Sequence, residues 1–144
     1  MSDVVLDANV LVGLLDQNDS LHQRATDLLA QMQGRGDQPV MLDVMVSETV
    51  SALCRRATQR KSGPPGLGRV RGQIHAWLEA GLVTFVHDAV AELFEEIVDA
   101  TEASGGVLNF NDAALVLLQR EGTIGDVATF DANLAGTADF RAVT

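Results

Sequence analysis

The chain has 144 residues, of which 47% are hydrophobic and 21% charged, and its formal net charge at pH 7 is −10. This composition is typical of a folded domain and excludes intrinsic disorder, and we expect one domain over residues 1–144. No apolar run reaches the roughly 18 residues of a membrane span, and the single cysteine, Cys54, excludes an intrachain disulfide. Because no basic, signal-like segment precedes Asp3 and Asp7, we expect a cytoplasmic protein that does not associate with membranes.

Short apolar runs alternate with helical patterns along the chain. The runs predict strands over 4–6, 39–42, 82–86 and 126–130, with a short fifth strand over 140–143. The helical patterns cover 10–15, 20–33, 43–60, 69–80, 88–101 and 111–118. This alternation is typical of an α/β fold, with a short, mainly parallel sheet of four to five strands covered by helices on both faces.

Local signals give three further expectations. Ser20 with Gln23 three residues later predicts a capping box at the start of a helix. The apolar spacing after Asp88 predicts one long helix as far as about Thr101. The segment KSGPPGLG, 61–68, predicts a loop, since proline cannot continue a helix.

The basic residues are concentrated in one segment of an acidic chain. Six of the ten lie within residues 55–71, which contain no acid, and these are Arg55, Arg56, Arg60, Lys61, Arg69 and Arg71. Arg55 and Arg56 share a helical face with Glu48. The segment therefore predicts a surface that binds the RNA backbone. A solvated helix face and a docking site for an acidic segment of a protein partner are the alternatives.

Four acids occupy positions where the predicted fold could bring them together. Asp7 ends the first strand, Asp131 follows the fourth, Asp112 opens a buried helix, and Glu48 lies early in the helix after the second strand. Ligands of open α/β sheets bind beyond the carboxyl ends of the strands. Converging carboxylates repel one another unless a cation separates them, and all-oxygen ligation favours Mg²⁺ or Mn²⁺ over zinc or copper. Taken singly, each acid could instead be a helix cap, a turn residue or a surface residue.

Together, the strings around these acids resemble the PIN-domain ribonucleases. The strings are VVLDANVL (4–11), SE (47–48), NDA (111–113) and VATFDANL (127–134), and the size resembles the VapC-type toxins of type II toxin–antitoxin pairs. The resemblance implies a three-layer α/β/α fold, a homodimer, an RNA substrate and a cognate antitoxin. It also implies that the catalytic and metal-binding acids are Asp7, Glu48, Asp112 and Asp131, with Asn9 and Thr129 as supporting polar residues. Asn133 departs from the pattern, because many members carry a further Asp there.

The resulting hypothesis is a Mg²⁺- or Mn²⁺-dependent endoribonuclease that needs no covalent nucleophile. A haloacid-dehalogenase-type phosphatase is disfavoured, because it needs a second Asp where Asn9 stands. A phosphoacceptor receiver domain needs a Lys near the end of a late strand, whereas the only lysine is Lys61. The remaining alternative is a PIN-fold protein that binds protein or RNA and whose metal sites bind too weakly to support catalysis.

Overall fold

The computed structural model describes residues 1–60 and 67–144, and these form an α/β fold with an all-parallel sheet. In chain order the elements are β1 (Asp3–Leu6), α1 (Ala8–Leu15), α2 (His22–Arg35), β2 (Gln38–Leu42), α3 (Asp43–Gln59), α4 (Gly68–Glu79), β3 (Val83–Thr84), α5 (His87–Glu92), α6 (Phe94–Ala103), α7 (Phe110–Arg120), β4 (Asp126–Ala128), α8 (Ala132–Ala135) and β5 (Ala142–Val143). The predicted α/β class and parallel sheet are thus confirmed.

The order of the strands puts β1 at the centre of the sheet. The five described strands run β3-β2-β1-β4-β5, with Val5 of β1 opposite Val40 on one side and Val127 on the other. From β1 the chain builds outward through β2 to β3 and then returns to place β4 against the free edge of β1. The strand order therefore reverses between β1 and β4, and this switch point is where open α/β sheets bind ligands.

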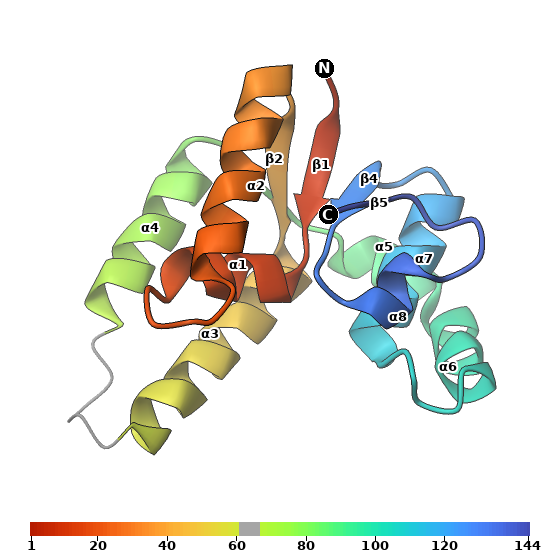
Figure 1. Ribbon diagram of the computed structural model, residues 1–144. Helices are drawn as coiled ribbons and strands as arrows, with labels where there is room; N and C mark the ends of the chain where they lie inside the picture. The colour runs from red at the N-terminus through yellow and green to blue at the C-terminus, as the bar shows by residue number, and fades with distance from the viewer. Residues whose placement is uncertain (61–66) are drawn as a thin grey trace.

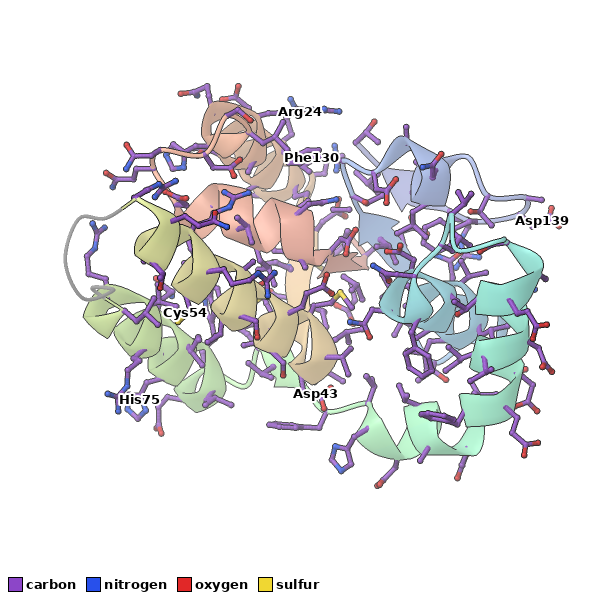
Figure 2. The ribbon with its side chains drawn as sticks, turned by 90° about the horizontal axis from the view of Figure 1, so that it is seen from below. Arg24, Asp43, Cys54, His75, Phe130 and Asp139 are labelled. Carbon is purple, nitrogen blue, oxygen red and sulfur yellow. The ribbon has the colours of Figure 1, made fainter. Side chains whose placement is uncertain are left out.

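The helices cover both faces of the sheet, as the three-layer prediction requires. Helices α1 to α4 lie on one side of the strands and α5 to α7 on the other (Figure 1 and Figure 2). Val4, Val5 and Leu6 of β1 are almost completely buried, because helices pack on both faces of the central strand. On α7, residues 113–116 are buried without interruption, which confirms the prediction that this apolar helix lies inside the protein.

Two local predictions are wrong. Ser20 does not cap a helix: α2 begins at His22, and the Asp19 carboxylate accepts the Leu21 backbone N–H at 2.8 Å. The long helix after Asp88 is two helices, α5 and α6, separated at Leu93. The interruption lets Ala89 pack on the main core while Ile97 packs against α7 in a separate cluster.

Other boundaries differ by a few residues. Strand β3 is limited to Val83–Thr84, and β4 ends at Ala128. Part of the predicted 61–68 loop, including Lys61, lies outside the described residues. Within the described ranges, no helix combines the length and apolar character that crossing a membrane requires.

Candidate active site

Asp7 lies at the carboxyl end of β1, at the switch point of the sheet. Its backbone N–H donates to the Ala128 carbonyl at 2.9 Å, which ties the residue to the end of β4. Its carboxylate accepts the Ala8 N–H at 2.8 Å and the Thr129 hydroxyl at 2.7 Å. Asp7 therefore caps α1, as the structural alternative expected, but it is also 95% buried beside other acids. The capping role is thus confirmed, and the catalytic and metal-binding role of Asp7 stays a prediction.

Thr129 connects Asp7 to two other predicted site residues. Its fully buried Oγ1 donates to Asp7 and accepts the Asp131 backbone N–H at 3.0 Å and, more weakly, the Asn9 amide at 3.4 Å. The Asn9 Oδ1 accepts the Phe130 backbone N–H at 3.2 Å. One hydroxyl and one amide thus fix the chain after β4 relative to β1 and α1.

Asp131 continues this chain into a short helix. Its Oδ1 accepts the backbone N–H of Asn133 at 2.8 Å and, at 3.4 Å, that of Leu134, so the side chain caps α8. The second carboxylate oxygen makes none of these contacts.

Asp112 and Glu48 are positioned by two asparagines. Asp112 forms a reciprocal capping box at the start of α7, where its carboxylate accepts the Asn109 N–H at 3.1 Å and its N–H donates to the Asn109 side chain at 2.9 Å. The Asn111 amide donates to Glu48 Oε2 at 3.0 Å, which joins α3 to α7 across 63 positions of sequence. Neither asparagine was assigned a role from the sequence.

The four acids act on one another electrostatically. Burial, followed by the charges of Asp112 and Glu48, raises the pKa of Asp7 to about 6, against the lowering effect of the Thr129 and Ala8 hydrogen bonds. Burial also raises the pKa of Asp112, and the charges of Asp131 and Glu48 add to that effect. Within the described residues, no arginine, lysine or histidine forms an ion pair with any of the four. The cluster is therefore an uncompensated concentration of negative charge.

The donor chemistry of this cluster fits a hard divalent cation. Its potential ligands are carboxylate oxygens, which Mg²⁺ and Mn²⁺ prefer, and a cation would relieve the repulsion that helps to raise the pKa of Asp7 and Asp112. As the side chains stand, however, no three His, Cys, Asp or Glu residues in the described ranges are arranged as a ready metal cage. Each of the four carboxylates instead accepts at least one hydrogen bond from the chain itself.

The basic segment is divided between different environments. Arg55 lines two cavities together with Glu48, and Arg56 lines the second of these. Arg56 is ion-paired with Asp19 and contacts Asp16 at 3.4 Å, and Arg60 contacts Asp16 at 2.7 Å. Both aspartates precede α2, so these pairs link the α1–α2 connection to α3.

The rest of the basic segment lies apart from the acids. Arg69, on α4, lines a separate cavity, and none of the four acids lines that cavity. Arg71 lies exposed on the same helix. Lys61 lies outside the described residues. The described basic residues of segment 55–71 therefore lie in different places relative to the acids, and RNA binding by this segment stays a prediction.

The comparison with known families agrees with this arrangement. A model of the PIN domain matches residues 4–139, which include all four acids and both supporting polar residues. The chain belongs to the PIN domain family. No curated protein sequence matches the chain.

Membership of the PIN domain family supports a coarse function. PIN domains are generally metal-dependent nucleases, so the family indicates a nuclease that hydrolyses phosphodiester bonds. In this PIN domain the charges of Asp112 and Glu48 act on Asp7 and those of Asp131 and Glu48 act on Asp112, so the four acids are linked electrostatically. Thr129 contacts Asp7, and Asn9 contacts Thr129 and the Phe130 backbone.

Proposed function

We propose that this PIN domain is a Mg²⁺- or Mn²⁺-dependent endoribonuclease and the toxin of a VapBC-type toxin–antitoxin pair. The observation that carries the proposal is the cluster of four carboxylates without an ion-pair partner in the described chain, at the switch point of the sheet. A protein gains no stability from gathering such charges, since their repulsion opposes folding. Binding a divalent cation for catalysis accounts for the arrangement.

The chain's own residues would perform the positioning. Asp7, Glu48, Asp112 and Asp131 would hold the cation, and Thr129, Asn111 and Asn109 would keep the carboxylates in place through the hydrogen bonds they make. When bound, such a cation makes water a better nucleophile at neutral pH and stabilises charge on the phosphate and the leaving oxygen. Burial of Asp7 keeps bulk water from that carboxylate, which strengthens its electrostatic interactions.

The proposal is tested by RNA cleavage in the presence and absence of metal. We expect the protein to cleave RNA with Mg²⁺ or Mn²⁺ and to lose this activity in EDTA. Asp112→Asn should abolish cleavage, because it removes a carboxylate from the cluster while Asn still accepts or donates a capping hydrogen bond. Asp99→Asn is the matched control, since Asp99 is an exposed acid on α6.

The toxin assignment is the finer part of the proposal and has its own test. It is supported by the resemblance of the ordered motifs and of the chain length to VapC-type toxins. The proposal includes a homodimer, a cytoplasmic location and an antitoxin encoded by a neighbouring gene. Co-expression with the small protein encoded next to this gene should yield a stable complex that no longer cleaves RNA. A neighbouring product that neither binds nor inhibits would contradict the assignment.

A second candidate function is a PIN-fold protein that binds RNA or protein without turnover. It is favoured by the absence, in the described residues, of three ligating side chains arranged as a metal cage, and by Asn133 in place of a further acid. RNA binding with no cleavage in either Mg²⁺ or Mn²⁺ would support this candidate over the nuclease.

A further inference from the structure

The acidic character of the protein poses a problem for the proposed function. RNA is a polyanion, and a net charge of −10 repels it. Cations that offset this repulsion must lie near the acids and must not be neutralised by neighbouring carboxylates. Ion pairs already engage several described arginines, namely Arg35 with Asp37, Arg56 and Arg60 with Asp16 and Asp19, and Arg141 with Asp126.

Arg55 satisfies both conditions on one side of the cluster. It is exposed, and no ion pair involves it within the described residues. It lines a cavity of about 370 Å³ with Glu48 and Asn111, and a second of about 220 Å³ with Glu48 and Asn9. Arg55 therefore borders two cavities that both adjoin Glu48, a candidate metal ligand.

Arg24 of α2 satisfies the same conditions at another acid. It lines a cavity of about 450 Å³ with Thr129, Phe130 and Asp131. Its guanidinium carbon lies 4.4 Å from the centroid of the Phe130 ring, and Figure 2 shows the two labelled residues side by side. A cation–π contact fixes the plane of a guanidinium but leaves its N–H groups free to donate at the edges.

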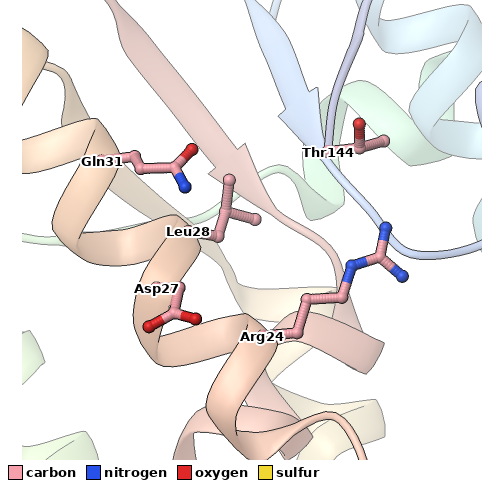
Figure 3. Close-up of a pocket in the computed structure, with 5 residues that line it drawn as sticks. All are labelled: Arg24, Asp27, Leu28, Gln31 and Thr144. Carbon is pink, nitrogen blue, oxygen red and sulfur yellow. The ribbon is translucent and has the colours of Figure 1, made fainter.

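A second cavity at Arg24 gives the direction in which this side chain reaches. In Figure 3 the guanidinium extends away from Asp27, an acid of the same helix, and toward Thr144. Neither Asp27 nor Asp131 neutralises Arg24, since the described residues contain no ion pair that includes Arg24. Arg24 is thus a held but uncompensated cation next to Asp131.

The two arginines flank the cluster of acids. Arg55 borders two cavities lined by Glu48, whereas Arg24 borders a cavity lined by Asp131, and no residue lines both an Arg55 cavity and this Arg24 cavity. Asp7 lies between these two sides of the site, because the Thr129 hydroxyl that donates to Asp7 also accepts the Asp131 N–H, and because the Asn9 side chain that lines a cavity with Arg55 accepts the Phe130 N–H. A single RNA strand crossing the acids would meet one guanidinium before the cluster and the other after it.

We propose that Arg55 and Arg24 bind the backbone phosphates on either side of the phosphodiester that is cleaved in single-stranded RNA. This inference rests on the proposed function and assigns the substrate-binding residues of the same site. Guanidinium groups bind phosphate through paired hydrogen bonds, which suits both side chains. Among the three described arginines at positions 55–60, the inference assigns phosphate binding to Arg55, because Arg56 and Arg60 are ion-paired with Asp19 and Asp16 and link α3 to the α1–α2 connection.

The test is the salt dependence of RNA affinity in the inactive Asp112→Asn protein. The probe is a fluorescein-labelled, mixed-sequence RNA 12-mer without secondary structure, titrated in Mg²⁺ at several salt concentrations. Arg55→Gln and Arg24→Gln should each flatten the log–log slope by roughly 0.7 and weaken binding about fourfold at 0.15 M salt, and the double variant should lose roughly 1.4. Arg55→Lys and Arg24→Lys should keep most of the slope, because they keep the charge.

Arg60→Gln, at the C-cap of α3, is the matched control and should leave the slope unchanged. Arg56→Gln should change the slope less than Arg55→Gln, because Arg56 lines the smaller cavity with Arg55 but is ion-paired with Asp19. The inference is overturned if the Gln variants at 55 and 24, shown to be folded by circular dichroism, bind RNA with the parental slope. It is also overturned if Arg56→Gln flattens the slope as much as Arg55→Gln does. In each of these cases the unmodified protein would still cleave RNA. Failure of this inference is therefore distinguishable from failure of the proposed function, in which the unmodified protein would not cleave RNA.

Discussion

The Thr129 hydroxyl is the residue-scale feature that links the most site residues. It donates to Asp7 and accepts from the Asp131 backbone and the Asn9 amide, and it is fully buried. Thr129→Val keeps the shape but removes this hydroxyl, so the buried carboxylate of Asp7 loses a donor. We expect the free energy of unfolding to fall by about 1–3 kcal/mol and RNA cleavage to fall about 10- to 100-fold.

Thr129→Ser is the control for this substitution, because it restores the hydroxyl. Urea denaturation and initial cleavage rates would measure both effects. If Thr129→Val cleaved RNA as fast as the unmodified protein, the hydroxyl would have no part in positioning the acids.

Asp7 should make the metal-free protein less stable as the pH rises. Its pKa is raised from 3.8 to about 6, mainly by burial, so the folded protein retains a proton at pH values where the unfolded chain has lost it. The stabilisation from this group is therefore complete below pH 4 and is lost as the pH rises through about 6. In EDTA, we expect the unmodified protein to lose about 1 kcal/mol of stability between pH 5 and pH 7 that Asp7→Asn does not lose.

The same variant separates charge from structure. At pH 7 in EDTA, Asp7→Asn should be at least as stable as the unmodified protein, because the buried charge is gone, yet it should cleave no RNA. Urea denaturation at both pH values measures the difference, with Asp99→Asn as the exposed control. If the stability of the unmodified protein and that of Asp7→Asn changed equally with pH, burial would not raise the pKa of Asp7.

The positions of the four acids in the fold could be predicted from the sequence more readily than their hydrogen-bond partners. Asp7 and Asp131 follow strands and Asp112 opens a helix, positions that a sequence can indicate. By contrast, the Asn111–Glu48 hydrogen bond joins residues 63 positions apart, and nothing local to either residue indicates it. Arg55 and Arg56 are neighbours of the same type, and only the placement of Asp16 and Asp19 distinguishes them.

At the scale of elements, Asp16 links the end of α1 to α3. Arg56 and Arg60 both contact its carboxylate, and the hydrogen bond from Arg60 is the main cause that lowers the pKa of Asp16. The resulting stabilisation is present at neutral pH and is lost as the pH falls below the ordinary range of an aspartate. This sign is opposite to that of Asp7.

Asp16→Asn should weaken this link between the two helices. We expect a loss of about 1 kcal/mol in the free energy of unfolding at pH 7, smaller in high salt, because the arginines are partly exposed. Urea denaturation at low and high salt measures it, with the exposed Asp27→Asn as the control. A loss that high salt leaves undiminished would mean that packing, and not charge, is responsible.

The boundaries of elements were less predictable than their existence. The apolar spacing from Val90 to Ile97 is continuous, so the sequence predicts one helix. In the structure Ala89 packs on the main core and Ile97 in the cluster with α7, while Val90 and Leu93 pack against both. A tertiary requirement interrupts a helix that local propensity would continue. The capping box was likewise expected at Ser20 and is found at Asn109 and Asp112, where the chain enters the buried helix α7.

At the scale of the whole molecule, the strand order creates the site. Short, fully apolar runs separated by helices predict a parallel sheet, and the structure has one. The order β3-β2-β1-β4-β5 does not follow from those runs, because it depends on the chain returning to the free edge of β1. That return brings Thr129 and Asp131 next to Asp7, and it concentrates the negative charge that a cation would offset.

The central claim is that these four carboxylates form a divalent cation site, and thermal unfolding tests it most directly. Melting temperatures would be measured without RNA in EDTA, Mg²⁺ and Mn²⁺ for the unmodified protein, Asp112→Asn and Asp99→Asn. At metal concentrations about 100 times the dissociation constant, the unmodified protein and Asp99→Asn should gain about 2.7 kcal/mol, which corresponds to roughly 5–10 °C. Asp112→Asn should gain much less. Equal melting temperatures with and without metal in the unmodified protein, or an equal gain in Asp112→Asn, would contradict the account.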